Sequence, residues 1–130
     1  MLDFKLILFV GLGGFLGAIL RTILINLTNK FIYQNINFSI LIVNVFGCFL
    51  LGILLSYLQD KESSQFIKYF INIGLLGAFT TFSAFSYDNL LLLQNKFYIK
   101  LIINIILNVS ICILAIYIGE KFLNNFKNLF

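Results

Sequence analysis

Residues 74–86 read GLLGAFTTFSAFS and lie in an apolar segment that carries no charged residue between Lys68 and Asp88. This stretch is poor material for a continuous helix, because glycine lowers helix stability and the hydroxyls of Thr and Ser compete for backbone hydrogen bonds. A break within a membrane would expose carbonyl oxygens, which are tolerated at that depth only where protein or an ion satisfies them. We therefore predict a transmembrane helix that is broken near its middle.

The rest of the chain is equally apolar. Of its 130 residues, 61% are hydrophobic and 11% are charged, whereas soluble domains carry about 25% charged residues. The mean hydropathy is +1.02. Four long runs of uncharged, mostly apolar residues divide the chain. They predict four transmembrane helices, at approximately residues 5–27, 37–58, 67–93 and 98–120. We expect a single all-α integral membrane domain, residues 1–130, in the inner or plasma membrane.

A cleaved signal peptide is the competing interpretation of the first apolar segment. No small-residue cleavage site separates it from the next apolar stretch, and its n-region carries only Lys5 against Asp3. We therefore favour a retained helix.

The basic residues give the chain almost no preferred orientation. With a cytoplasmic N-terminus, five would face the cytoplasm and four the outside. The first set is Lys5, Lys61, Lys68, Lys121 and Lys127, and the second is Arg21, Lys30, Lys96 and Lys100. Such a chain can insert both ways, so we predict an antiparallel, dual-topology homodimer. If Arg21 lies inside the protein, a weak preference for a cytoplasmic N-terminus remains.

The composition disfavours several other classes. The nine basic residues are spread singly along the chain, so nucleic acid is not an expected partner. There is no His, and Cys48 and Cys112 each lie within an apolar run, so the sequence supports neither a metal–thiolate site nor a disulfide. No pattern indicates catalysis, and we do not expect an enzyme.

The first helix combines small residues with one cation. Gly13 and Gly17, like Gly14 and Ala18, are spaced so that helix backbones can approach closely in lipid, and we assign them to packing. Arg21 follows one turn later. A cation there either snorkels to the interface or lines a wet vestibule that attracts anions.

Polar residues also interrupt the second and fourth helices. Asn44 stands alone among apolar neighbours, while Asn104, Asn108 and Cys112 recur every fourth residue with Ser110 nearby. Such groups serve either as hydrogen-bonded contacts between helices or as donors beside a pore. The sequence leaves both interpretations open.

The third helix favours an ion pathway. Phe82 and Phe85 share one helix face, as do Ser83 and Ser86. Aromatic rings are positive at their edges, so they can line a path for an anion without offering a full charge that would trap it. Core packing is the plainer interpretation of the two rings, and the neighbouring hydroxyls weaken it.

At these residues the sequence resembles the Fluc, or CrcB, family of fluoride channels over essentially the whole chain. It has the family's Gly-Gly-x-x-Gly-Ala-x-x-Arg at residues 13–21 and its Val-Asn-x-x-Gly at residues 43–47. It also has the highly specific Gly-x-Phe-Thr-Thr-Phe-Ser-x-Phe at residues 77–85.

The resemblance implies passive export of fluoride, and hence fluoride resistance, by a dual-topology homodimer with two antiparallel pores. It also implies a structural Na⁺ at the dimer centre, bound by the main-chain carbonyls of Gly77 and Thr80. The implied pore residues and vestibule cation are Phe82, Phe85, Asn44, Thr81, Ser83, Ser86 and Arg21.

The sequence departs from the family pattern at a few positions. Ser39 and Ile40 stand where Gly-Thr is usual, Thr22 where Tyr is usual, and Ala84 where Thr is usual. Because Ile40 lacks a hydroxyl, one pore contact of the family pattern is in question.

Two other classes fit the size of the chain. A four-helix, dual-topology multidrug exporter would need a titratable group within the membrane. The five acidic residues lie at helix ends, and Asp88 is the one candidate for such coupling. A non-transporting assembly subunit is the third class, and it predicts no ion flux from the purified protein.

Overall fold

The computed structural model describes residues 3–30, 32–33, 36–58 and 64–127. The helices are α1 (Phe4–Thr28), α2 (Phe38–Leu58), η1 (Ile67–Leu76), α3 (Gly77–Phe79), α4 (Phe82–Gln94) and α5 (Tyr98–Lys127). In these residues, four spans are long and apolar enough to cross a membrane, as predicted. The last helix continues beyond the expected end at residue 120.

A short hairpin that the sequence did not predict lies between α1 and α2. Its strands are β1 (Ile32–Tyr33) and β2 (Ile36–Asn37). They pair antiparallel, with Ile32 opposite Asn37 and Tyr33 opposite Ile36.

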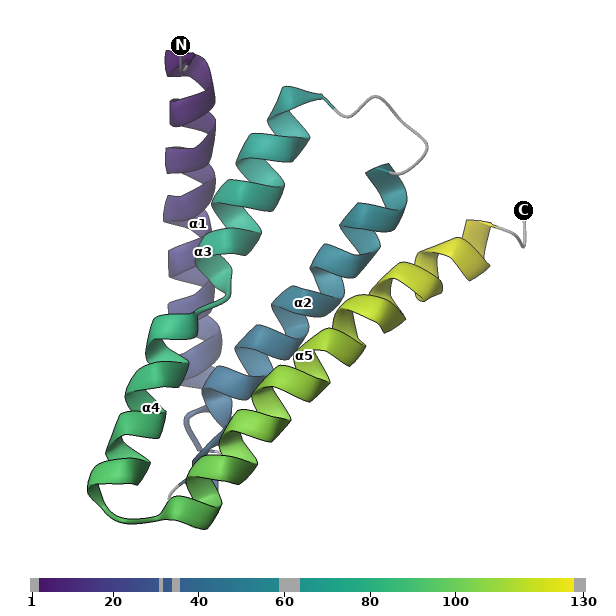
Figure 1. Ribbon diagram of the computed structural model, residues 1–130. Helices are drawn as coiled ribbons and strands as arrows, with labels where there is room; N and C mark the ends of the chain where they lie inside the picture. The colour runs from purple at the N-terminus through teal and green to yellow at the C-terminus, as the bar shows by residue number, and fades with distance from the viewer. Residues whose placement is uncertain (1–2, 31, 34–35, 59–63, 128–130) are drawn as a thin grey trace.

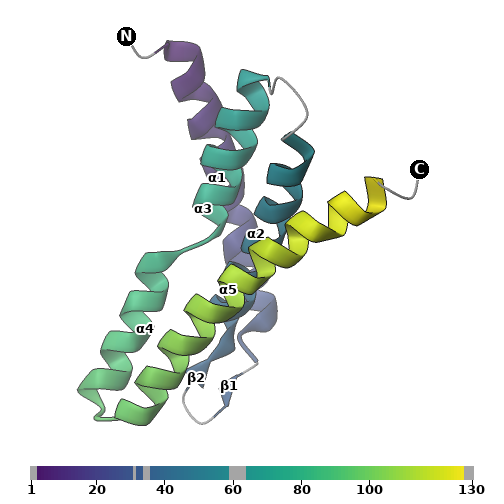
Figure 2. The ribbon, with the colours of Figure 1, turned by 45° about the vertical axis from the view of Figure 1, so that its right-hand side comes forward.

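The third span divides between two sides of the bundle. Its first half, η1, packs mainly on α1, whereas its second half, α4, packs on α5 (Figures 1 and 2). The other close pair is α2 with α5. A straight helix could not make both contacts, so the break allows one span to contact two different neighbours.

The predicted break lies at Thr80 and Thr81. Both residues are extended, with φ −77° and ψ 152° at Thr80 and φ −145° and ψ 116° at Thr81. The half before the break is a π-helix, which the sequence did not predict. At its end, the amide of Gly77 donates to the carbonyl oxygens of both Asn72 and Gly74. π-Helical turns are rare in proteins, and those that occur are often found at functional sites.

Small residues let α1 and η1 touch along their backbones. A Cβ on Gly13 would overlap the carbonyl oxygen of Phe70, and a Cβ on Gly17 would overlap that of Leu75. From the other side, a Cβ on Gly74 would lie 3.0 Å from the Cα of Gly13. The packing role predicted for Gly13 and Gly17 is therefore confirmed.

Large apolar side chains point outward along every long helix. Phe15 on α1, Phe46 on α2 and Ile113 on α5 are all exposed. The side chains buried most completely are small, namely Val43, Ser39 and Ser56. An apolar exterior and a small buried core suit a protein surrounded by lipid. Apolar side chains that face lipid tails carry no free-energy penalty of the kind they would carry in water.

Candidate functional site

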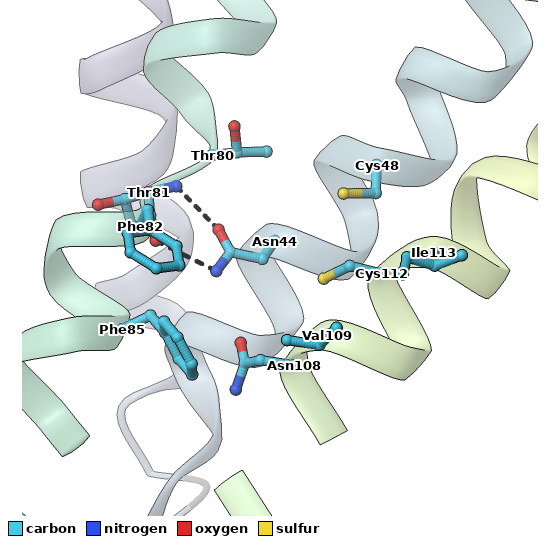
Figure 3. A pocket seen from close by; sticks show the side chains of 10 residues that line it. All are labelled: Asn44, Cys48, Thr80, Thr81, Phe82, Phe85, Asn108, Val109, Cys112 and Ile113. Atoms are coloured by element: carbon cyan, nitrogen blue, oxygen red, sulfur yellow. Dashed lines mark hydrogen bonds between the residues drawn. The ribbon is translucent and has the colours of Figure 1, made fainter. Parts of the chain in front are cut away.

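A side chain from α2 binds the break in the third span. Asn44 faces the extended residues between α3 and α4 (Figure 3). Its Oδ1 accepts a hydrogen bond from the amide of Thr81 at 2.8 Å, and its Nδ2 donates to the carbonyl oxygen of Thr81 at 3.2 Å. This is a contact between helices, one of the two roles considered for Asn44. A side-chain amide has two N–H donors, so one stays available for a second role.

At the break, two backbone amides donate to side chains and not to helical carbonyl oxygens. In an uninterrupted α-helix each amide donates to the carbonyl four residues earlier. The amide of Thr81 would then donate to Gly77, but it donates to Asn44. The amide of Ala84 would donate to Thr80, but it donates to Oγ1 of Thr81 at 3.2 Å. Carbonyl oxygens released in this way are the ligand type that Na⁺ takes in discontinuous membrane helices.

Gly47 gives the break room to approach α2. It lies about one turn after Asn44, and a Cβ at this position would overlap the Cγ2 methyl of Thr80. The same Cβ would lie 2.9 Å from Cδ1 of Phe79, which is buried. The Val-Asn-x-x-Gly motif thus has a structural basis, because Asn44 binds the break and Gly47 allows its close approach.

A cavity of about 310 Å³ opens beside the break. The residues that line it come from α2, the break, α4 and α5 (Figure 3), and they are Asn44, Cys48, Thr80, Thr81, Phe82, Phe85, Asn108, Val109, Cys112 and Ile113. The ring centroids of Phe82 and Phe85 are 5.3 Å apart, with 53° between the ring planes. Phe82 is 76% exposed and Phe85 is 7% exposed. One ring is therefore free to meet an ion or a second chain, and the other is part of the packed interior.

A chain of three side-chain amides connects α4 to α5, and it begins at Asn108 in the cavity wall. Nδ2 of Asn108 donates to the carbonyl oxygen and to Oδ1 of Asn104, each at 3.1 Å. Nδ2 of Asn104 in turn donates to Oδ1 of Asn89 at 2.9 Å. Asn108 is 6% exposed, and its Oδ1 has no hydrogen-bond partner among the residues that the structure describes. This chain of amides therefore holds the two helices together, and the oxygen of Asn108 lies on the side that faces Asn44 (Figure 3).

Several predicted site residues do not line this cavity. Ser83 and Ser86 are exposed on α4, and Ser110 is exposed on α5. Gly77 is exposed at the start of α3, and Arg21 is half-buried on α1. The roles predicted for these residues stay predictions.

Two residues of this region were missed by sequence reasoning. Asn89 completes the amide chain, and Cys48 lines the cavity. A periodic signal existed for both, since Asn89 follows Phe85, and Cys48 follows Asn44, by four residues along one helix face.

Comparison with known proteins identifies the family. Residues 8–120 match the family described as CrcB-like protein, Camphor Resistance (CrcB). The chain belongs to the CrcB family. It is 56% identical over 113 residues to the fluoride-specific ion channel FluC of Campylobacter jejuni (serotype O:23/36, strain 81-176), which covers 87% of this chain and 93% of the relative. The match to FluC of Campylobacter lari covers the same shares at 50% identity. FluC of Shewanella piezotolerans is 43% identical over 88% of this chain and 93% of its own length.

Membership of the CrcB family confirms the resemblance read from the three motifs. Together with the four apolar spans, it establishes a multi-pass membrane protein. The matched residues include every residue that lines the cavity. The cavity therefore belongs to the part of the chain that defines the CrcB family.

Proposed function

We propose that this protein is a fluoride-selective ion channel that exports fluoride passively across the cell membrane. The observation that carries the proposal is an amide- and aromatic-lined cavity at a mid-span helix break in a CrcB-family chain. The relatives described above, which bear the name fluoride-specific ion channel, support the choice of ion.

The cavity suits a small, strongly hydrated anion. Conduction requires groups that replace water without binding the ion so tightly that it cannot leave. Asn44 retains one N–H donor, and the edges of Phe82 and Phe85 carry partial positive charge. Among the described residues that line the cavity none is charged, so an anion passing through meets no full charge that would trap it.

The direction of transport follows from the acid chemistry of fluoride. Hydrogen fluoride is a weak acid whose neutral form crosses bilayers, so an acidic exterior loads the cytoplasm with fluoride. The membrane potential is negative inside and drives the anion outward through a passive channel. The biological result is a lower cytoplasmic fluoride concentration and resistance to fluoride.

Fluoride efflux from liposomes tests the proposal. The purified protein would be reconstituted, and efflux would be followed with a fluoride electrode, with chloride as the control ion. We expect fluoride efflux without chloride efflux, and its loss in Phe82→Ile. Phe15→Ile is the matched control, because Phe15 is an exposed ring on α1 away from the cavity. Efflux that appears only under an opposing proton gradient would instead support the exporter, and no efflux from folded protein would support the assembly subunit.

The proposal includes a structural Na⁺ at the break that is not transported. The two diverted amides support it, because they release the carbonyl oxygens of Gly77 and Thr80 from their usual helical partners. A second copy of the chain would bring the same pair of oxygens to the ion. Replacing Na⁺ by a large organic cation should lower the thermal stability of the purified protein and reduce fluoride efflux. Equal stability in both buffers would contradict a structural ion.

The proposal also includes an antiparallel homodimer. It is supported by the near balance of basic residues and by the exposed face that contains Phe82, Ser83 and Ser86. A protease-cleavable tag at the C-terminus, examined in sealed vesicles of one orientation, would show one protected and one cleaved population. The mass of the purified protein in detergent would correspond to two chains. A single tag population would contradict dual topology.

A further inference from the structure

Two cysteines from different spans lie in the wall of the same cavity. Cys48 belongs to α2 and Cys112 to α5, and both thiols are free. Their sulfur atoms lie on the same side of the α2–α5 pair (Figure 3), and both side chains line the one cavity. The structure thus creates a two-sulfur cluster that the separate positions of the cysteines in the sequence do not reveal.

Close backbone contact keeps the two sulfurs together. Gly52 lies about one turn beyond Cys48 on α2, and Ile116 lies about one turn beyond Cys112 on α5. A Cβ on Gly52 would overlap the carbonyl oxygen of Ile116, so the two backbones touch there. The register of α2 against α5 is therefore fixed one turn away from the thiols, and the pair is preorganised without a covalent link.

The ligand set of this cluster selects a particular class of metal. Sulfur ligands favour soft cations, whereas structural zinc takes four ligands. The chain has two Cys and no His, and the described residues hold no group of three His, Cys, Asp or Glu side chains. The class that remains is a soft ion that accepts linear coordination by two sulfur ligands, such as Hg²⁺ or Cu⁺. We propose that Cys48 and Cys112 together bind one soft, two-coordinate metal ion per chain.

Binding of Hg²⁺ to the two thiols changes no oxidation state and needs no oxidant. Two S–H bonds break, two Hg–S bonds form, and both protons pass to water. The product has no net charge, which suits the apolar wall of the cavity because an uncompensated charge would be costly there. Thiols bind metals as thiolates, so binding strengthens as pH rises.

A bound metal would also affect ion movement. The two sulfurs share the cavity with Asn44 and Phe82, so a metal ion between them would narrow the route proposed for fluoride. This consequence rests on the proposed function, whereas metal binding itself does not.

Binding would be measured on the full-length protein in detergent with Hg²⁺ as the probe. An excess of a small monothiol would be present, so that only a two-sulfur site retains the ion. We expect one retained Hg²⁺ per chain and protection of both thiols from alkylation. Cys48→Ser and Cys112→Ser should each weaken retention by more than the roughly 10- to 100-fold that loss of an outer-shell partner costs. Val109→Ser is the matched control, because it changes the same cavity wall and keeps both thiols.

Metal stoichiometry and thiol protection can each contradict the shared site. Two Hg²⁺ per chain, or equal retention by the native protein and a single-serine variant, would show that the cysteines act separately. Alkylation of both thiols at the same rate with and without Hg²⁺ would show the same.

Fluoride efflux from liposomes tests the consequence. Hg²⁺ should slow efflux by the native protein and leave efflux by the Cys48→Ser, Cys112→Ser double variant unchanged when each is compared with and without metal. Unchanged efflux by the native protein with Hg²⁺ bound would place the site outside the conduction route. If untreated protein conducts no fluoride, the proposed function fails, and the binding measurement still decides the metal site.

Discussion

The side-chain amide of Asn44 pairs with the backbone of Thr81 through two hydrogen bonds, one accepted from the amide and one donated to the carbonyl oxygen. A residue on the second span thus supplies hydrogen bonds that the third span loses where its helix breaks. The two spans are therefore coupled, and the conformation of the break depends on α2.

Asn44→Leu should destabilise the protein. The substitution leaves the amide and the carbonyl oxygen of Thr81 without their partners, and each unsatisfied buried group costs about 1–3 kcal/mol. The free energy of unfolding in detergent micelles would be measured by denaturant titration. Ser110→Leu, at an exposed polar position on α5, should change that free energy by no more than about 0.5 kcal/mol. Equal effects of the two variants would show that the pairing does not stabilise the break.

Gly13→Ala and Gly11→Ala should have opposite effects. A Cβ at Gly13 overlaps the carbonyl oxygen of Phe70, whereas a Cβ at Gly11 has nothing within 4 Å. Overpacking of this kind typically costs about 1–3 kcal/mol. At the open position, alanine favours the helix by up to about 1 kcal/mol over glycine. Thermal unfolding in one detergent would rank Gly11→Ala above the native protein and Gly13→Ala below it. Similar unfolding temperatures would argue against the tight α1–η1 contact.

Truncation of the two cavity phenylalanines should affect the free energy of unfolding and fluoride efflux to different degrees. Phe85 is buried, so Phe85→Ala should lower the free energy of unfolding by about 3–5 kcal/mol. Phe82 is largely exposed within one chain, so Phe82→Ala should cost less stability while still reducing fluoride efflux. Unfolding and efflux would be measured on the same preparations. A larger loss of stability for Phe82→Ala would show that a second chain covers this ring.

Lys96→Gly should stabilise the turn between α4 and α5. Lys96 has φ 59°, in the left-handed region that costs a residue with a Cβ about 1–2 kcal/mol. Its amide donates to the carbonyl oxygen of Leu93 at 3.0 Å, and glycine preserves that bond. We expect a gain of up to about 1 kcal/mol by denaturant titration, because glycine also loses more entropy on folding. Lys96→Ala keeps the same strain and should gain nothing, which separates relief of the backbone from loss of the lysine side chain.

Much of the fold could be predicted because it depends on local properties. Hydropathy and charge-free length placed the four spans, and the glycines and hydroxyls of residues 74–86 placed the break. The spacing of Gly13 and Gly17 indicated a close helix contact. The π-helical winding of η1 could not be predicted, because its hydrogen-bond pattern differs from that of an α-helix by one residue and has no strong sequence signal.

The sequence by itself determined that this chain is a membrane protein of the CrcB type with a broken third span. Apolar length and motif spacing depend only on residues that are close together in the sequence. Only the tertiary structure decided that Asn44 pairs with Thr81 and that Cys48 and Cys112 share one cavity wall. These contacts depend on the register between helices, which is set where Gly47 and Gly52 let backbones and side chains approach. Helices in lipid associate through packing rather than through a hydrophobic driving force, so the partner of each polar residue follows from shape complementarity.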